Sequence, residues 1–174
     1  FLPRLAKGLE VPCFSLTGPT SGSDAATLRD IGTVTKGMHE GKETLGIRLS
    51  WDKRYITLGP KATLVGLAFR LFDPENHLGK GEDVGITLAL IPANHPGVNI
   101  GRRHLPSGAA FPNGPNWGKD VFIPMEWVIG GDKMAGAGWR MLMECLSAGR
   151  AISLPSSATS GAKTMLRFTS AYAR

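Results

Sequence analysis

Two long apolar runs, residues 62–72 and 84–92, constrain the fold most strongly. Both are rich in Leu, Val, Ile, Phe and Ala, and both have the length of a buried strand. The segment between them, residues 73–83, is polar and turn-forming, so we expect an exposed loop that joins two central strands. The 23 glycines and 12 prolines indicate frequent turns. The sequence therefore predicts a mainly β body.

A hairpin is predicted before these runs. Residues 31–38 and 45–51 have the composition of strands, and the residues between them have turn chemistry. In the second strand, Ile47, Leu49 and Trp51 alternate with polar residues. This pattern predicts a sheet with one buried face and one face in contact with water.

The segments that follow carry weaker signals. Residues 52–59 predict a turn that leads into a short strand, and residues 118–124 predict a further strand. Between the apolar runs and that further strand, residues 102–117 are expected to be irregular. Prolines interrupt this segment at three positions: Pro106, Pro112 and Pro115.

Helical spacing occurs at both ends of the chain. Residues 1–10 carry leucines at helical spacing, and from Gly138 apolar residues recur at i, i+3, i+4 and i+7. We expect the C-terminal pattern to form two helices, separated near Gly149 and Arg150. Pro155 is expected near the start of the second helix, where its missing N–H does no harm.

The charge argues against nucleic-acid binding. The net charge is +6, from 20 basic and 14 acidic side chains. The basic residues are scattered, and no aromatic residues alternate with them as a single-strand binder requires. A non-catalytic, basic β-domain that binds nucleic acid is nevertheless the alternative from a different functional class.

Other site types have little support in the sequence. Cys13 and Cys145 are far apart and are read as buried thiols rather than as a disulfide or metal pair. The four histidines show no ligand spacing, so we predict no metal site. The sequence has neither an apolar run long enough to span a membrane nor a signal peptide, which makes the cytoplasm the expected compartment.

The stretch from Cys13 to Asp24 is the candidate binding loop. It begins as a short strand and breaks at Gly18 and Pro19 into a loop of small residues. Gly22 permits a close approach of the backbone to a ligand. Hydroxyl groups that can donate to that ligand belong to Thr17, Thr20, Ser21 and Ser23. A polar, planar ligand with an anionic tail suits this loop, and the alternative is an ordinary surface turn.

The order of residues in this stretch resembles the first signature of the acyl-CoA dehydrogenases, Tyr/Phe-x-x-Thr-Glu-Pro-x-x-Gly-Ser-Asp. Gly18 stands where the family usually has Glu. Residues 53–57 resemble the family's Lys-x-Trp/Tyr-Ile-Thr segment, and residues 96–101 its Pro-Gly-Val-x-Ile-Gly. Pro124 and residues 128–131 match the segment that closes the family's β-domain. The resemblance runs through essentially the whole chain and is closest to the bacterial long-chain β-oxidation type.

This resemblance implies a domain organisation. The antiparallel β-barrel or sandwich-like middle domain is expected at residues 12–135, with flavin and acyl-CoA binding. Residues 1–11 would be the end of an N-terminal helical domain and its linker. Residues 136–174 would be the start of a C-terminal helical domain. The chain begins without Met and stops inside a helical pattern, so we expect a piece of a larger protein.

The resemblance also implies a function, the α,β-desaturation of a fatty acyl-CoA to a trans-2-enoyl-CoA with FAD as hydride acceptor. The implied FAD contacts are Phe14, Leu16, Thr17, Gly22, Ser23, Tyr55, Ile56 and Thr57. The implied acyl-CoA contacts are Ser23, Ser147 and Arg150. A modest positive charge would help to attract the coenzyme A phosphates. An electron-transfer flavoprotein is the implied electron acceptor, and a homo-oligomer is the implied assembly.

The catalytic base is not expected in this chain. Some relatives place a Glu immediately before the arginine that matches Arg150, but here that residue is Gly149. The family's glycine-rich second FAD segment is also missing, so the chain alone is not expected to be an active enzyme. Two further alternatives remain, an acyl-CoA oxidase or nitroalkane-type relative and a structural pseudo-enzyme.

Overall fold

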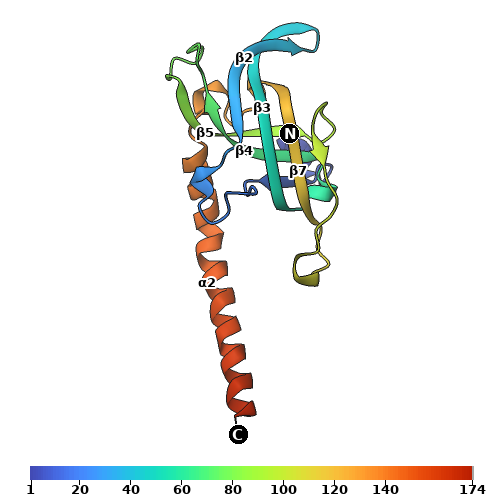
Figure 1. Ribbon diagram of the computed structural model, residues 1–174, viewed down its shortest axis with the longest axis vertical. Coiled ribbons are helices and arrows are strands. Elements are labelled where there is room, and N and C mark those ends of the chain that lie inside the picture. Colours follow the sequence, from blue (N-terminus) through green and yellow to red (C-terminus); the bar gives the residue numbers. More distant parts are fainter. Residues whose placement is uncertain (174) are drawn as a thin grey trace. The chain divides into compact units, whose positions relative to one another are not determined.

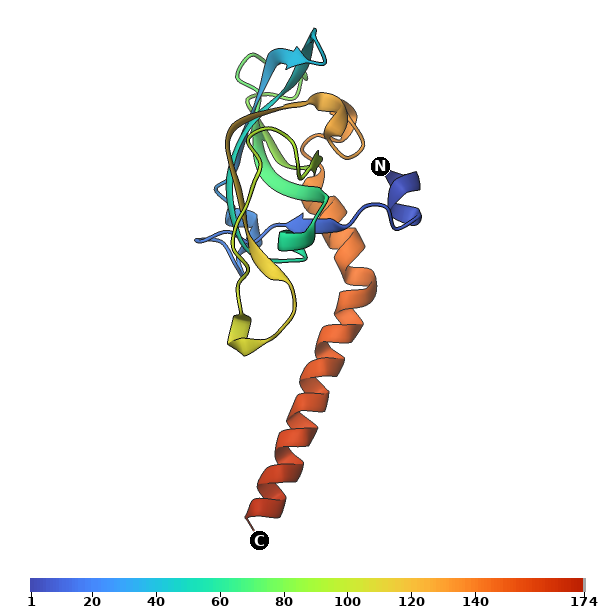
Figure 2. The same cartoon turned by 90° about the vertical axis from the view of Figure 1, so that its right-hand side faces the viewer.

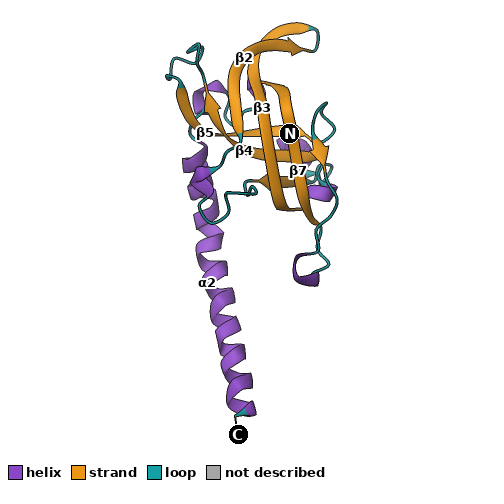
Figure 3. Cartoon of the chain, in the orientation of Figure 1, coloured by secondary structure: helices purple, strands orange, loops and turns teal. Residues whose placement is uncertain are grey.

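The computed structural model describes residues 1–173, which form two compact units. The first unit is Phe1–Gly138 and the second begins at Trp139. Figures 1 and 3 show that the first unit holds the strands and that the second is helical. A mainly β fold followed by helix is thereby confirmed. The predicted divisions after residues 11 and 135 stay predictions about the complete protein.

One seven-stranded sheet builds the first unit, and its strand order is β1-β4-β2-β3-β7-β6, with β5 on β4. The strands are β1 Pro12–Ser15, β2 Ile31–His39, β3 Lys42–Thr57, β4 Leu64–Phe72, β5 Asp83–Pro92, β6 Asn99–Ile100 and β7 Asn113–Pro124. The sheet curls on itself, as Figure 2 shows. It is mixed rather than wholly antiparallel, because β1 and β2 both run parallel to β4.

Short helical segments connect or flank these strands. The predicted N-terminal helix is present as α1, Leu2–Ala6. Single 3-10 turns occur at Ala25–Thr27, Gly59–Lys61, Pro106–Gly108, Met125–Trp127 and Asp132–Met134.

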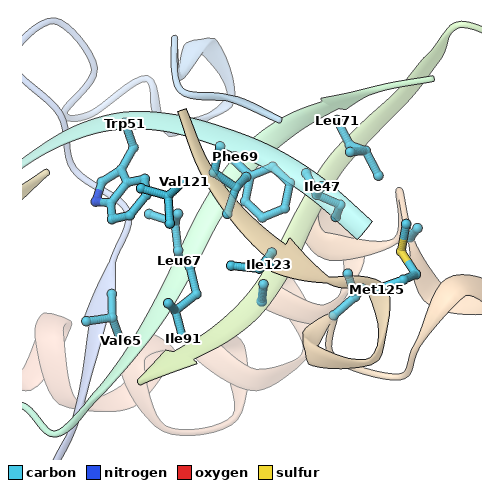
Figure 4. Close-up of a cluster of buried hydrophobic side chains, with 14 of the residues drawn as sticks. Ile47, Trp51, Val65, Leu67, Phe69, Leu71, Ile91, Val121, Ile123 and Met125 are labelled. Atoms are coloured by element: carbon cyan, nitrogen blue, oxygen red, sulfur yellow. The ribbon is translucent and has the colours of Figure 1, made fainter. Parts of the chain in front are cut away.

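The two apolar runs form the predicted central strands. β4 and β5 pair antiparallel from Leu64 opposite Pro92 to Phe72 opposite Asp83. The inward side chains of these strands meet those of β3 and β7 in one core, which Figure 4 shows. The predicted alternation in β3 is confirmed, because Ile47, Leu49 and Trp51 are all buried. Burial of this apolar surface is the main favourable term for the unit.

Two predictions for the middle of the chain were wrong. β3 continues without a turn through Asp52, and β7 begins at Asn113 although residues 102–117 were expected to be irregular. Pro115 fits inside β7 because the facing β3 has a bulge between Lys53 and Ile56, so no regular ladder bond is lost there.

The predicted break in the C-terminal helix was also wrong. α2 is a single helix, Gly138–Tyr172, with Pro155 inside it. Proline removes one N–H bond and crowds the preceding turn. A break would instead leave up to four N–H and four C=O groups without helical partners, which explains why one continuous helix is tolerated.

The segment after β7 covers the outer edge of β5. Ile129 N–H donates to Leu88 O at 2.8 Å, and Gly136 N–H donates to Thr87 Oγ1 at 2.9 Å. The Lys80 ammonium holds this segment with all three of its donors. Its acceptors are the carbonyls of Asp132, Lys133 and Ala135, at 3.0, 2.8 and 2.8 Å.

The loop at residues 16–30 lies at a gap between two strands. β1 pairs with residues 64–67 of β4, and β2 pairs with residues 70–72. Because β5 occupies the other edge of β4, β1 and β2 follow one another along the same edge. The loop leaves β4 after β1 and returns to it at Asp30, whose carbonyl accepts from Arg70 N–H at 2.8 Å.

A fully buried lysine joins the two ends of this loop. The Lys53 ammonium donates to Leu16 O at 2.8 Å and forms an ion pair with the Asp30 carboxylate. We call Lys53, Leu16 O and the Asp30 carboxylate the Lys53 clamp. Asp30 Oδ1 also accepts from Asp52 N–H at 3.0 Å. Burial lowers the pKa of the Lys53 ammonium, and the Asp30 charge opposes that shift.

Removing one member of the clamp leaves a buried charge without a partner. We expect Lys53→Met to reduce the free energy of unfolding by about 3–5 kcal/mol. The double variant Lys53→Met with Asp30→Asn should lose less, because no buried charge remains and the amide oxygen still accepts from Asp52 N–H. Urea unfolding measures both values.

The exposed Arg48–Asp120 pair, at 3.2 Å, provides the matched control. Arg48→Met should change the free energy of unfolding by no more than about 1 kcal/mol. A double variant as unstable as Lys53→Met alone would show that the unpaired carboxylate is not the cause of the loss.

The reactivity of the Cys13 thiol reports whether β1 is packed against the rest of the sheet. Its side chain is buried, and burial raises the pKa of its thiol. We expect iodoacetamide to leave Cys13 unmodified in the native protein at neutral pH and to modify it in urea. The mass of the peptide that contains Cys13 reports the outcome. Alkylation at the same rate in both conditions would contradict a buried β1.

Candidate functional site

The candidate loop and the segment at residues 55–57 lie beside each other. Arg54 N–H donates to Thr17 O at 3.0 Å, and the Lys53 ammonium bonds the carbonyl of the preceding residue, Leu16. Thr57 is three residues beyond Arg54 on β3, which is at most about 10 Å along a strand. The backbones of the two threonines therefore lie close together, at most about 10 Å apart along β3 from the Arg54 contact.

Both threonines have free hydroxyl groups in the part of the chain that the structure describes. The side chain of Thr17 is half-buried and that of Thr57 is exposed. Within residues 1–173, neither hydroxyl forms a hydrogen bond. Each can therefore donate to, or accept from, a bound polar group.

Tyr55 presents an aromatic face at the same place. Its side chain is 61% exposed, and its ring lies 5.0 Å from the His104 ring at an angle of 51°. Tyr55 has a φ of 59°, which is uncommon for a bulky residue. The buried Asn113 stabilises this conformation, because its Nδ2 donates to Tyr55 O at 2.9 Å. The bulge in β3 thus turns the tyrosine out of the sheet.

The other predicted FAD contacts differ in accessibility. Phe14 is 41% exposed on β1, whereas Leu16 is half-buried and contributes its carbonyl to the Lys53 clamp. Ile56 belongs to the hydrophobic core, so only its backbone could reach a ligand. Gly22 and Ser23 are exposed in the middle of the loop. A Cβ added at Gly22 would meet no described atom within 4 Å, so packing in residues 1–173 does not require glycine there.

Two open pockets adjoin these segments. One, of about 490 Å³, includes Tyr55, Arg54 and His104 in its lining. The other, of about 750 Å³, includes residues 18–21 of the loop. They share Asp52 and Trp117. Neither Thr17 nor Thr57 lines either pocket. Each is close in sequence to a lining residue, Thr17 to Gly18 and Thr57 to Tyr55.

The predicted acyl-CoA contacts fall in different units. Ser23 is in the first unit, whereas Ser147 and Arg150 are exposed on α2, three residues apart. The Ser147 hydroxyl donates to Glu144 O at 3.3 Å within the helix. Their joint role in substrate binding stays a prediction.

The buried residues that hold the loop and the end of β1 from inside were not predicted from the sequence. Besides the Lys53 clamp, Asn116 Nδ2 donates to Ser15 Oγ at 2.9 Å, and Trp51 Nε1 donates to Asn116 Oδ1 at 3.0 Å. All of these side chains are buried. Lys53 could have been found, because it continues the inward alternation of Ile47, Leu49 and Trp51 by one more step.

The chemistry of this site fits the isoalloxazine of FAD. An exposed aromatic face offers stacking. The two free threonine hydroxyls offer hydrogen bonds to the polar edges of a flat ring. Residues 1–173 contain no group of three or more His, Cys, Asp or Glu side chains that could hold a metal ion. None of the described helices is both long and apolar enough to cross a bilayer.

Known proteins resemble this chain in sequence and in fold. The chain is 55% identical to Protein HemX of Proteus mirabilis over 104 residues. This match covers 60% of the chain and 61% of HemX. Butyryl-CoA dehydrogenase of Megasphaera elsdenii superposes with a TM-score of 0.65 at 25% identity, over 86% of this chain and 35% of that one. Glutaryl-CoA dehydrogenase of Mycobacterium smegmatis in complex with FADH2 gives a TM-score of 0.55 at 26% identity, over 74% and 29%.

These matches locate the chain within larger proteins. It spans about three fifths of HemX and about a third of the two dehydrogenases. The family model described as the acyl-CoA dehydrogenase middle domain matches residues 13–114, which contain the candidate loop, the Lys53 clamp and Tyr55–Thr57. Because that match covers more than half of the 174 residues, the chain belongs to the acyl-CoA dehydrogenase family.

Proposed function

We propose that this chain is the flavin-binding part of an FAD-dependent acyl-CoA dehydrogenase that converts fatty acyl-CoA into trans-2-enoyl-CoA in β-oxidation. The observation that carries the proposal is the contact between Arg54 N–H and Thr17 O. It places the hydroxyl loop beside the exposed Tyr55 in a member of this family. When bound, FAD supplies the hydride acceptor that no protein side chain can provide.

The residues of this chain then bind and orient. Tyr55 packs on the flavin ring, and the Thr17 and Thr57 hydroxyls bond its polar edges. Gly22 and Ser23 approach the phosphate end, and Ser23 also contacts the coenzyme A arm. On α2, Ser147 and Arg150 contribute to acyl-CoA binding. The base that removes the α-proton is a carboxylate from another part of the complete protein.

The proposed partners follow from the reaction. Each turnover leaves two electrons on the flavin, so an acceptor must remove them, and we propose an electron-transfer flavoprotein for this step. We also propose a homo-oligomer. The acyl chain is proposed to be of medium or long length, as in the bacterial β-oxidation type that the sequence resembles.

Flavin content is the direct test. We expect the purified full-length protein to carry FAD, visible by its absorbance, and we expect anaerobic addition of a long-chain acyl-CoA to bleach that absorbance. The corresponding free fatty acid serves as the control, because its carboxylate does not acidify the α-proton as a thioester does. Failure to bind FAD after reconstitution would refute the proposed function.

Substitutions of the residues proposed to contact the flavin ring should weaken the binding of FAD. Thr17→Val and Thr57→Val each remove one hydrogen bond, worth about 0.5–1.5 kcal/mol, and should raise the Kd for FAD by roughly 2- to 12-fold. Tyr55→Ala should raise it by a similar or larger factor, whereas Tyr55→Phe keeps the aromatic face and should change it little. Flavin fluorescence titration of the apoprotein measures these values.

Thr35→Val, in β2 away from the loop, is the matched control. It makes the same chemical change in the same sheet and should leave the Kd for FAD unaltered. Equal Kd values for Thr35→Val, Thr17→Val and Thr57→Val would contradict the assigned roles.

A further inference from the structure

The buried lysine has no part in the chemistry assigned above, yet it contacts both ends of the loop that carries Thr17 and Ser23. A charged side chain with no exposed surface is rare unless it is paired. Within its own strand, Lys53 stands two residues before Tyr55. It therefore connects the two segments that the proposed function assigns to FAD.

The contacts of Lys53 divide between the start and the end of the loop. At the start, its ammonium donates to Leu16 O at 2.8 Å. At the end, it pairs with the Asp30 carboxylate, which also accepts from Asp52 N–H at 3.0 Å. The fifteen residues from Leu16 to Asp30 thus begin and end at one ammonium group.

The sheet holds the loop directly at its return, where Arg70 N–H donates to Asp30 O at 2.8 Å, but it does not hold the residues that cross the gap. The β4 edge pairs with β1 up to Ser15 and resumes with β2 at Ile31, so the loop crosses a gap opposite Ala68 and Phe69. The backbone contact from Arg54 N–H to Thr17 O is one neutral hydrogen bond. The charged contacts of Lys53 are stronger than such a bond and set the distance between the loop and β3.

We propose that Lys53 is a positioning residue for FAD, which uses the Lys53 clamp to hold Thr17 at a fixed distance from Tyr55 and Thr57. This inference rests on the proposed function. Lys53 itself has no exposed surface and acts through Leu16 O and Asp30 rather than by touching the ring. Preorganised ligand-binding groups bind more tightly because less conformational freedom is lost on binding.

The test uses the full-length protein and a variant that keeps the interior free of unpaired charge, Lys53→Met with Asp30→Asn. Hydrogen exchange of the apoprotein reports the order of residues 17–29, and flavin fluorescence titration reports the Kd for FAD. We expect faster exchange confined to the loop and a Kd at least tenfold higher than that of the wild type.

Ile123→Ala provides a control for general loss of stability. Ile123 is fully buried and pairs with Ile47 seven residues along β7 from Asn116, so its cavity lies far from the loop. This variant should unfold more easily in urea, yet keep the wild-type exchange of residues 17–29 and the wild-type Kd for FAD. A Kd raised equally in Ile123→Ala would show that stability alone, and not positioning, governs FAD binding.

The remaining outcomes separate the two proposals. Unchanged loop exchange in the double variant, or faster exchange with an unchanged Kd, would overturn the positioning role while the proposed function stands. A wild-type protein that binds no FAD would overturn the proposed function and the positioning role with it.

Discussion

The first unit depends on one buried cation, the Lys53 ammonium, which must be paired inside the protein. Lys53 has no exposed surface, so its ammonium must find all its acceptors inside the protein. It finds them at the two ends of the loop at residues 16–30, where the edge of β4 has a gap between β1 and β2. A neighbouring polar chain from Trp51 through Asn116 to Ser15 holds the end of β1 from the same interior side. Polar contacts therefore close the curled sheet where the backbone ladder is interrupted.

Two residues of β3 that are two positions apart, Lys53 and Tyr55, face the interior and the surface respectively. Lys53 points inward, whereas the bulge that follows gives Tyr55 a left-handed backbone and exposes its ring. A bulge commonly re-aims a side chain next to a functional site, and Asn113 stabilises this one by bonding the Tyr55 carbonyl. The residue that anchors the loop and the residue that presents the aromatic face are thus only two positions apart in β3.

Strands that depend on apolar pattern could be predicted from the sequence. The central pair β4 and β5, the hairpin of β2 and β3 and the inward face of Ile47, Leu49 and Trp51 all follow from periodicity. The start of β7 was missed because Pro115 signals a break, and only the bulge in the partner strand makes it acceptable. Of the candidate site, the hydroxyl loop and Tyr55 could be identified. The pairing of Lys53 with Asp30 could not, since it joins residues 23 apart through a gap that only the sheet topology creates.

The segment that follows β7 has a consequence for the behaviour of the sheet during synthesis. Its contacts with Leu88 and Thr87, together with the three carbonyls held by Lys80, occupy the side of β5 that faces away from β4. An uncovered strand of this kind offers free N–H and C=O groups to any extended chain nearby. Nascent chains that end before Val128 would expose this unpaired edge of β5. The segment after β7 must therefore leave the ribosome before the edge is protected from pairing with other chains.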